Sequence, residues 1–340
     1  MIITLTVNPS LDRTVELADE LMRGGVQRAT NAHQESGGKG VNVCRALNAS
    51  GVASTAVLPG DPDDPVLAGL RAAGVPFRNV PIGTPLRSNI TLTEPDGTTT
   101  KINEPGPALG STELAHLLET VVSECSGAAW LVLAGSLPPG VPTTFYATVI
   151  QAVRARYPDN PPLIAVDSSG APLIDTLAAN VLPDLLKPNA EELAELSGVA
   201  DGDALEADST LAASAAAALV GAGVGTVLAT LGARGALLVT AAEAWEATHP
   251  PVAARSTVGA GDSALAGYLL AHTAGGTPEQ SLRQAVAHGS AAAALPGSTV
   301  PALNQTTPEA VTTRRLPLHN APTDTPLNAP LPKEEDQWHS

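Results

Sequence analysis

The chain has 340 residues and a formal net charge of −16 at pH 7, from 34 acidic and 18 basic side chains. This balance argues against nucleic-acid binding, which usually needs a basic face, and it makes any local cluster of cations informative about an anionic ligand. Aromatic residues make up only 2%, so Ala, Val and Leu must build the core. The length fits one large α/β domain with a small appendage as well as two domains.

The first segment, residues 2–8, is apolar and β-branched and predicts a buried strand. No basic region and no cleavage site accompany it, so we expect no signal peptide. The uncharged stretch 211–233 is long enough to suggest a membrane span, but its four glycines and many alanines favour a soluble helix, a turn and a strand. Cys44 and Cys125 have no metal-ligand spacing, and we expect reduced core thiols in a cytoplasmic protein.

Further along the chain, short apolar runs alternate with amphipathic patterns. The runs that predict strands are 130–133, 163–166, 185–186 and 226–229. The helical patterns cover about 41–50, 64–73, 111–124, 143–156, 189–197, 207–221, 261–274 and 279–294. Apolar strands between amphipathic helices are typical of a mostly parallel sheet covered on both faces. Ligands of such sheets gather at the carboxyl ends of the strands.

Two segments, 12–36 and 86–104, break this rhythm because their residues alternate between polar and apolar. With the turn signal at 95–97, they predict antiparallel strands of a small separate sheet that could cover a site as a lid. The residues from 316 onward contain five prolines and few large apolar side chains. We therefore expect a folded domain over 1–310 and a poorly ordered tail over 316–340.

The strongest chemical signal is the run Gly259, Ala260, Gly261 and Asp262 at the start of an apolar helix. The first N–H groups of a helix have no intrahelical partner and lie at its positive end. Glycines let a phosphate approach that backbone closely. Asp262 has two possible roles by spacing alone: it could cap the helix, or it could accept the proton of a hydroxyl that attacks the bound phosphorus.

A second glycine-rich run holds Gly37, Gly38 and Lys39, and Asn42 follows three positions after Lys39. It is not a Walker A loop, because Lys39 is followed by Gly rather than Ser or Thr. The run could bring sugar hydroxyls to the backbone, or it could be an ordinary turn between a strand and a helix. Asp12, just after the first strand, could accept hydrogen bonds from two sugar hydroxyls or simply belong to a turn.

A third signal places Lys187 at the end of a strand and Asn189 at the start of a helix. Glu192 shares a face with Asn189, so the pair could form a capping box. Alternatively, the two side chains could lie near Mg²⁺, held through water because Mg²⁺ keeps several waters. The run from Thr230 to Gly235 follows another buried strand and could pass close to nucleotide phosphates or ribose.

Together these motifs resemble those of the ribokinase-like, PfkB-type carbohydrate kinases, over about residues 1–300. They occur in the family's order: Asn-Pro-x-x-Asp from Asn8, Gly-Gly-Lys-Gly-x-Asn from Gly37, Gly-Ser-Leu-Pro-Pro-Gly from Gly135, Lys-Pro-Asn-x-x-Glu from Lys187, and Thr-Val-Gly-Ala-Gly-Asp-Ser from Thr257. The resemblance implies a three-layer α/β/α domain with a mostly parallel sheet and a small β-sheet lid.

The resemblance also implies roles for single residues. Asp262 would be the catalytic base, and Gly259, Ala260 and Gly261 would complete the anion hole. Asn189 and Glu192 would serve Mg²⁺ and phosphate. The implied ATP contacts are Lys187, Asn189, Thr230, Gly232, Gly235, Gly259, Gly261 and, more loosely, Ser290. The implied sugar contacts are Asp12, Gly37, Gly38, Lys39 and Asn42.

One segment indicates the branch of the family. The run from Arg87 through Asn89 to Ile90 is similar to the Arg-Thr-Asn-Ile segment of 1-phosphofructokinases and tagatose-6-phosphate kinases. Arg87, Lys39 and Arg28 could hold a substrate phosphate, a task that suits the planar fork of arginine. Asn89 belongs to the same segment as Arg87, so we also count it among the substrate-binding residues.

The expected activity is transfer of the γ-phosphate of ATP to the 6-hydroxyl of fructose 1-phosphate, with Mg²⁺, to give fructose 1,6-bisphosphate and ADP. Tagatose 6-phosphate and fructose 6-phosphate are alternative acceptors, while Arg87 argues against plain sugars and nucleosides. A pseudokinase that binds a sugar phosphate as a regulator is the non-enzyme alternative. The resemblance implies a homodimer through the lid, and we expect neither a nucleic-acid nor a membrane partner.

Overall fold

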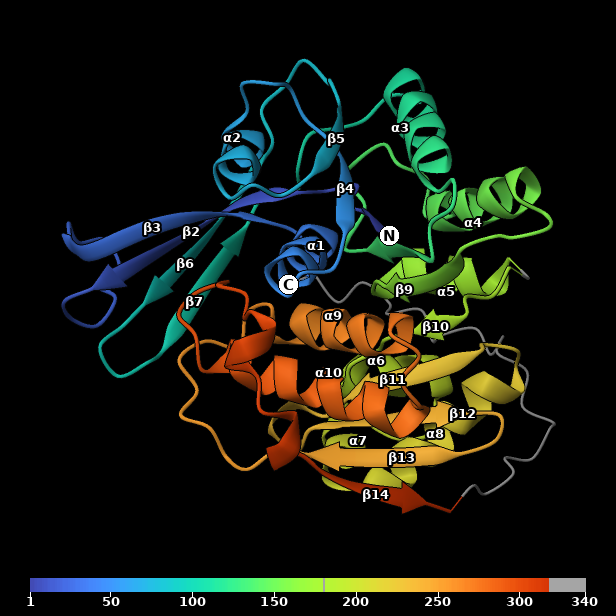
Figure 1. The fold of residues 1–340 in the computed structure, drawn as a ribbon. Helices are drawn as coiled ribbons and strands as arrows, with labels where there is room; N and C mark the ends of the chain where they lie inside the picture. The colour runs from blue at the N-terminus through green and yellow to red at the C-terminus, as the bar shows by residue number, and fades with distance from the viewer. Residues whose placement is uncertain (180, 318–340) are drawn as a thin grey trace, which may run out of the picture.

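The computed structural model describes residues 1–179 and 181–317. Its strands form a sheet of ten strands and a separate sheet of four, which extends to one side of the main body in Figure 1. Within the described residues, no helix is long and apolar enough to cross a membrane.

The main sheet has the strand order β14-β13-β12-β11-β10-β9-β8-β1-β4-β5. Neighbours from β11 to β5 pair in parallel, and β11 to β14 pair antiparallel, so the expected mostly parallel sheet is confirmed. The strands are β1 Ile2–Leu5, β4 Ser54–Pro59, β5 Phe77–Val80, β8 Trp130–Ala134, β9 Leu163–Asp167, β10 Leu185–Leu186, β11 Thr226–Thr230, β12 Ala236–Thr240, β13 Ala244–Thr248 and β14 Thr312–Leu316.

Helices cover both faces of this sheet and make three layers (Figure 1). One buried cluster joins α3, α4, α5, α6 and α8 to the sheet, and another joins α1, α9 and α10. The helices are α1 Lys39–Ala49, α2 Pro65–Ala72, α3 Ser111–Glu124, α4 Phe145–Arg156, α5 Gly170–Ala178, α6 Ala190–Ser197, α7 Gly202–Ala207, α8 Ser209–Gly221, α9 Ala260–Thr273 and α10 Pro278–Ala293. Cys44 and Cys125 are buried free thiols, as expected.

The small sheet, which we call the lid, has the order β3-β2-β6-β7, with β2 Ser10–Leu17, β3 Ala29–Gly37, β6 Arg87–Thr93 and β7 Thr99–Asn103. The expectation that all its strands pair antiparallel is wrong, because β2 and β6 are parallel. Both strands start where the chain leaves the main domain, with Ser10 opposite Arg87. They therefore run outward in the same direction, and β3 and β7 are their antiparallel hairpin partners.

The edge of the main sheet extends further along the chain than expected. Strand β14 pairs with β13, and Leu316 is only 4% exposed, so the sheet continues past the boundary expected at 310. The tail expected over 316–340 falls, from residue 318 on, outside the described residues. The helix expected over 207–221 is α8, which begins at Ser209 because the side chain of Asp208 caps it, and a separate short helix, α7, ends at Ala207.

Candidate active site

Two cavities meet at the start of α9. The first has a volume of about 400 Å³ and is lined by Ser10, Asp12, Gly38, Lys39, Asn42, Arg87, Asn89, Lys187, Asn189, Glu192, Thr230, Val258, Gly259, Gly261 and Asp262. The second, of about 630 Å³, shares Asn189, Thr230 and Gly261 with it. Lys187 and Thr230 follow or end parallel strands, so the cavities lie where ligands of such sheets bind.

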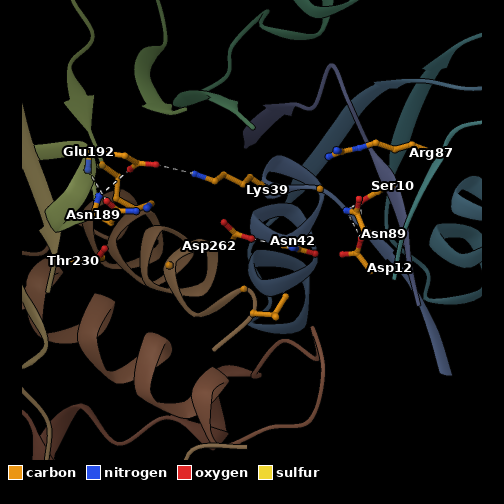
Figure 2. Close-up of a pocket in the computed structure, with 15 residues that line it drawn as sticks. Ser10, Asp12, Lys39, Asn42, Arg87, Asn89, Asn189, Glu192, Thr230 and Asp262 are labelled. Atoms are coloured by element: carbon orange, nitrogen blue, oxygen red, sulfur yellow. Dashed lines mark hydrogen bonds and ion pairs between the residues drawn. The ribbon is translucent and has the colours of Figure 1, made fainter. Parts of the chain in front are cut away.

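The first turn of α9 settles the role of Asp262 in the helix. Gly259 stands at the N-cap with φ 75°, and no side chain makes a capping hydrogen bond. The carboxylate of Asp262 instead accepts a hydrogen bond of 2.9 Å from Nδ2 of Asn42 (Figure 2). The capping alternative is therefore wrong, and the first N–H groups of the helix have no intrahelical acceptor.

The surroundings of Asp262 change its acidity. Burial and the negative charge of Asp167 raise its pKa to about 6, while the hydrogen bond from Asn42 and the ammonium groups of Lys39 and Lys187 act in the opposite direction. A carboxylate with a pKa near neutrality is better matched to proton transfer than an ordinary aspartate. The side chain is 7% exposed and faces the first cavity.

A carboxylate that the sequence analysis missed lies beside this centre. Asp167 is fully buried, and its two oxygens lie 2.7 Å from Nζ of Lys39 and 3.1 Å from Nζ of Lys187. Burial would raise the pKa of Asp167, but the two ammonium groups outweigh burial and lower it. The available signal was its place directly after the apolar run 163–166, at the carboxyl end of a parallel strand.

The two lysines bring positive charge to the start of α9. A Cβ atom added to Gly261 would lie 3.4 Å from Nζ of Lys187, so this ammonium lies close under the first turn of the helix. Burial would lower the pKa of Lys39, but Asp167 and Glu192 outweigh it and raise the pKa above its ordinary value. Lys39 therefore stays charged next to Asp262.

Lys39 does not lie where the sequence analysis expected it. Its side chain extends toward Asp167 and Glu192, with Nζ 3.7 Å from Oε1 of Glu192. In Figure 2 its ammonium points away from Arg87. The two cations thus lie toward opposite ends of the cavity, because the buried Asp167 and Glu192 attract the lysine.

At the start of α6, Asn189 and Glu192 form the capping box that was one of the two alternatives. Oδ1 of Asn189 accepts from the N–H of Glu192 at 2.7 Å, and Oε2 of Glu192 accepts from the N–H of Asn189 at 2.9 Å. One carboxylate oxygen, Oε1, is left over beside Lys39. This donor set fits a Mg²⁺ ion held through water on bound phosphates, but not one bound mainly by protein ligands.

The other end of the first cavity lies at the root of the lid. Oδ1 of Asp12 accepts from Oγ of Ser10 at 2.7 Å and from Nδ2 of Asn89 at 3.0 Å. A Cβ on Gly37 would collide with the Asp12 carboxylate, so glycine is required for this approach. Burial raises the pKa of Asp12. Ser10 is a lining residue that the sequence analysis did not single out.

Arg87 comes from the first residue of β6 and is held by backbone carbonyls. Its Nη1 donates to the carbonyl of Glu104 and its Nη2 to that of Asn8, both at 3.1 Å. Among the described residues, its buried Nε and Oδ1 of Asn89 have no hydrogen-bond partner. Both residues line the cavity, and their free polar atoms fit a hydroxylated or phosphorylated ligand.

Two predicted substrate contacts, Gly37 and Arg28, line neither cavity. Gly37 lies against the carboxylate of Asp12, which does line the first cavity, whereas Arg28 lies away from it. Arg28 is exposed on the loop between β2 and β3. The loop carries it to the outer part of the lid, whereas the cavity begins at the root of the lid strands.

The second cavity holds six of the nucleotide contacts expected from the sequence, while Lys187 and Gly259 line only the first cavity. The six are Asn189, Thr230, Gly232, Gly235, Gly261 and Ser290. Gly235 has φ 100°, and a Cβ there would collide with the carbonyl of Ala247, so only glycine fits this turn. Most other lining residues are small or apolar and were not predicted. They come from the segment before α9 and from α9 and α10: Pro250, Pro251, Val252, Ala254, Ala264, Val286, Gly289 and Ala293. Ala260, which was expected in the anion hole, lines this cavity as well.

Comparison with known proteins identifies the family. Residues 6–305 match the pfkB family carbohydrate kinase domain. The chain belongs to this family. A kinase of this family uses ATP as a substrate, and this pfkB kinase has two cavities that meet at Gly261, next to Asp262.

Three known proteins place this pfkB kinase more closely. It is 35% identical to a 1-phosphofructokinase from Xanthomonas campestris pv. campestris over 277 residues, which cover 79% of this chain and 83% of that protein. It is 32% identical to phosphofructokinase-2 from Escherichia coli in complex with fructose-6-phosphate, with a TM-score of 0.79 and coverage of 89% and 96% of the two chains. A ribokinase from Thermotoga maritima, at 20% identity, shares the fold with a TM-score of 0.70 over 90% and 97% of the two chains. The expected ribokinase-like fold is confirmed.

Proposed function

We propose that this pfkB kinase transfers the γ-phosphate of ATP to a sugar phosphate, most specifically to the 6-hydroxyl of fructose 1-phosphate. The observation that carries the proposal is the place of Asp262. Its buried carboxylate lines the polar cavity that reaches Arg87, next to Gly261, where this cavity meets a second cavity of small residues. The products are fructose 1,6-bisphosphate and ADP.

In this proposal the acceptor sugar lies in the first cavity. Asp12, Asn89 and Asn42 orient its hydroxyls together with the backbone at Gly37 and Gly38. Arg87 binds the phosphate that the acceptor already carries, at the end of the cavity remote from Asp262 (Figure 2). Arg87 suits this task because its guanidinium donates in a fixed planar geometry and is already held by two carbonyl groups.

ATP lies in the second cavity, with its phosphates toward Thr230, Asn189 and Gly261, the residues common to both cavities. Asp262 takes the proton of the acceptor hydroxyl as that oxygen forms a bond to the γ-phosphorus, and the bond from this phosphorus to the bridging oxygen of ADP breaks. The free N–H groups at Gly261 and Asp262 and the ammonium of Lys187 stabilise the charge on the moving group.

Mg²⁺ would be held on the ATP phosphates, with Glu192 and Asn189 reached through water, and it would neutralise charge on those phosphates. In this proposal the roles of Lys39 and Asp167 do not depend on the metal ion. The buried carboxylate of Asp167 keeps both Lys39 and Lys187 directed toward the junction of the cavities.

The choice of acceptor has a specific rival. The Xanthomonas relative is called a 1-phosphofructokinase, whereas the similar Escherichia coli structure holds fructose 6-phosphate. Tagatose 6-phosphate is the third candidate. All three acceptors carry a phosphate remote from the accepting hydroxyl, so Arg87 fits each of them.

The deciding experiment measures ADP release with fructose 1-phosphate, fructose 6-phosphate, tagatose 6-phosphate and ribose. We expect the highest kcat/KM with fructose 1-phosphate and almost no turnover of ribose, which has no phosphate for Arg87. A higher value with another sugar phosphate would reassign the acceptor. Binding of sugar phosphates with no turnover of any would instead support a regulatory pseudokinase.

We also propose that the kinase forms a homodimer through the lid. Four large apolar side chains of the lid and its β2–β3 loop are exposed, namely Leu21 (37%), Met22 (60%), Val26 (99%) and Ile102 (53%). Burial against a second copy would remove this surface from water. Sedimentation at micromolar concentration should give the mass of a dimer, and a monomer would refute the proposal.

A further inference from the structure

The hydrogen bond from Asn42 to Asp262 requires a defined orientation of the Asn42 amide. Nδ2 faces Oδ2 of Asp262 at 2.9 Å, and Oδ1 accepts from Nη1 of Arg45 at 3.3 Å. Asn42 and Arg45 lie one turn apart on α1, and Asn42 is 4% exposed. Arg45 itself lines neither cavity.

The two ends of an amide differ in chemistry but hardly in shape. A reversed amide would turn Oδ1 of Asn42 toward the carboxylate of Asp262 and Nδ2 toward the guanidinium of Arg45. Both contacts would then be repulsive, one between two acceptors and one between two donors. Because an arginine can only donate, Arg45 selects the orientation that directs an N–H group to Asp262.

Arg45 is held from two sides. Its Nη2 donates to Oε1 of Glu35, on lid strand β3, at 3.2 Å, and its Nη1 also reaches the carbonyls of Ser36 and Ser298. The other oxygen of Glu35 accepts from the N–H of Ser298 at 3.0 Å and from its hydroxyl at 2.6 Å. This network joins the lid, α1 and the segment after α10 behind the catalytic cavity.

We infer that Arg45 is a positioning residue for the carboxylate of Asp262, acting through the amide of Asn42, and that Glu35 of the lid holds Arg45 in place. The lid is thereby linked to the proposed base by a chain of side chains, separately from any contact it makes with the acceptor. The inference rests on the proposed function, because it assumes that Asp262 accepts the proton.

A double-mutant cycle tests the inference. The variants are Arg45→Met, Asn42→Ala and the double variant, with Arg154→Met as the matched control, because Arg154 tethers the carbonyl of Leu182 outside both cavities. We expect Arg45→Met to lower kcat about tenfold, the worth of one such hydrogen bond. In the Asn42→Ala background the same change should alter kcat less than about twofold, and the control should match wild type.

The pH profile separates positioning from simple destabilisation. The groups that face Asp262 are Asp167 on β9, Lys39 and Asn42 on α1, and Lys187 after β10. A donated hydrogen bond favours the charged carboxylate, so its loss in Arg45→Met should move the acid limb of kcat to higher pH. Asn42→Ala should show the same displacement, and the double variant should add nothing to it.

The inference would be overturned if Arg45→Met lowered kcat by the same factor in the wild-type and Asn42→Ala backgrounds. It would also be overturned if Arg45→Met changed the thermal midpoint of unfolding but left the pH profile of kcat unchanged. If Arg45→Met does not fold, Glu35→Gln takes its place in the cycle, with the same non-additivity expected. If wild type turns over no acceptor, the proposed function fails. The inference is then decided by the titration of Asp262 in carboxyl ¹³C NMR, assigned with Asp262→Asn, whose midpoint should rise in Arg45→Met only when Asn42 is present.

Discussion

The cavity that reaches Arg87 and the cavity beside Gly235 are lined by different kinds of groups. The first is lined by charged and amide side chains from α1 and the lid, several of them tied to one another by hydrogen bonds. The second is lined mainly by small and apolar residues, which leave the backbone accessible. Where side chains make the contacts to a ligand, a single substitution can change the affinity for it. Where the backbone and the shape of the cavity make them, the affinity depends on many residues at once. Single substitutions should therefore affect the acceptor side selectively.

The largest effect is expected at the junction of the two cavities. Replacement Asp262→Asn keeps the shape of the side chain but removes the proton acceptor, so kcat should fall by about 10²–10⁴. ATP affinity, measured by titration calorimetry, should stay near wild type, because the second cavity is unchanged. Turnover close to that of wild type would exclude Asp262 as the base.

The next effect separates the cavities. Replacement Arg87→Ala should raise KM for the sugar phosphate about 10- to 100-fold, because charged hydrogen bonds are worth about 1.5–3 kcal/mol. KM for ATP should stay unchanged, since Arg87 lines only the first cavity. Steady-state kinetics with each substrate varied in turn measures both, with Arg154→Ala as the control. An equal rise in KM for the sugar phosphate and KM for ATP would contradict the assignment of the two substrates to separate cavities.

The acidity of Asp262 predicts a pH dependence that belongs to the chemical step. Its pKa is raised to about 6, and only the ionised carboxylate can accept the proton. As pH falls through this value, kcat should decrease, and below it the loss should approach about tenfold per pH unit. Rapid-quench measurement of the phosphoryl transfer checks this. A constant rate down to pH 5 would show that another group accepts the proton.

The smallest effect is expected at Glu192, which lines the first cavity. Replacement Glu192→Gln keeps the capping box, because glutamine also completes it, and it removes the charge of Oε1. The Mg²⁺ concentration for half-maximal activity should rise about tenfold, while the rate at saturating Mg²⁺ stays close to wild type. A Mg²⁺ titration of both proteins tests this, with Glu195→Gln as the control, because Glu195 is exposed on the same helix and lines neither cavity. If the Mg²⁺ concentration for half-maximal activity did not change, Glu192 would have no role beyond capping the helix.

The local signals in the sequence predicted most elements that surround the site. The apolar runs at 130–133, 163–166 and 226–229 became strands of the main sheet, and the helix starts at Asn189 and near Gly259 lie within a residue or two of their expected places. Alternation predicted the lid strands, but it could not give their pairing. Whether β2 meets β6 in parallel depends on where both strands leave the main domain.

The side chains of the site were predicted as members of motifs, but their partners were not. Lys39 was assigned to a sugar phosphate because cations are scarce in this chain, yet its ammonium pairs with Asp167, 128 positions away. Asp167 followed an apolar run without any motif. Arg45 was not singled out, because nothing near it in the sequence indicates that Glu35 and Ser298 meet it.

The sequence alone determined the family resemblance, the parallel sheet and the glycine-rich start of α9 that suits a phosphate, because these depend on neighbouring residues in the chain. It left open whether Asp262 caps that helix or acts on a substrate. The tertiary structure excluded the cap, because it brings Asn42 within 2.9 Å of the Asp262 carboxylate, across 220 positions. Burial and opposing charges then determine the acidity of Asp262, and both are properties of the packed molecule rather than of any segment.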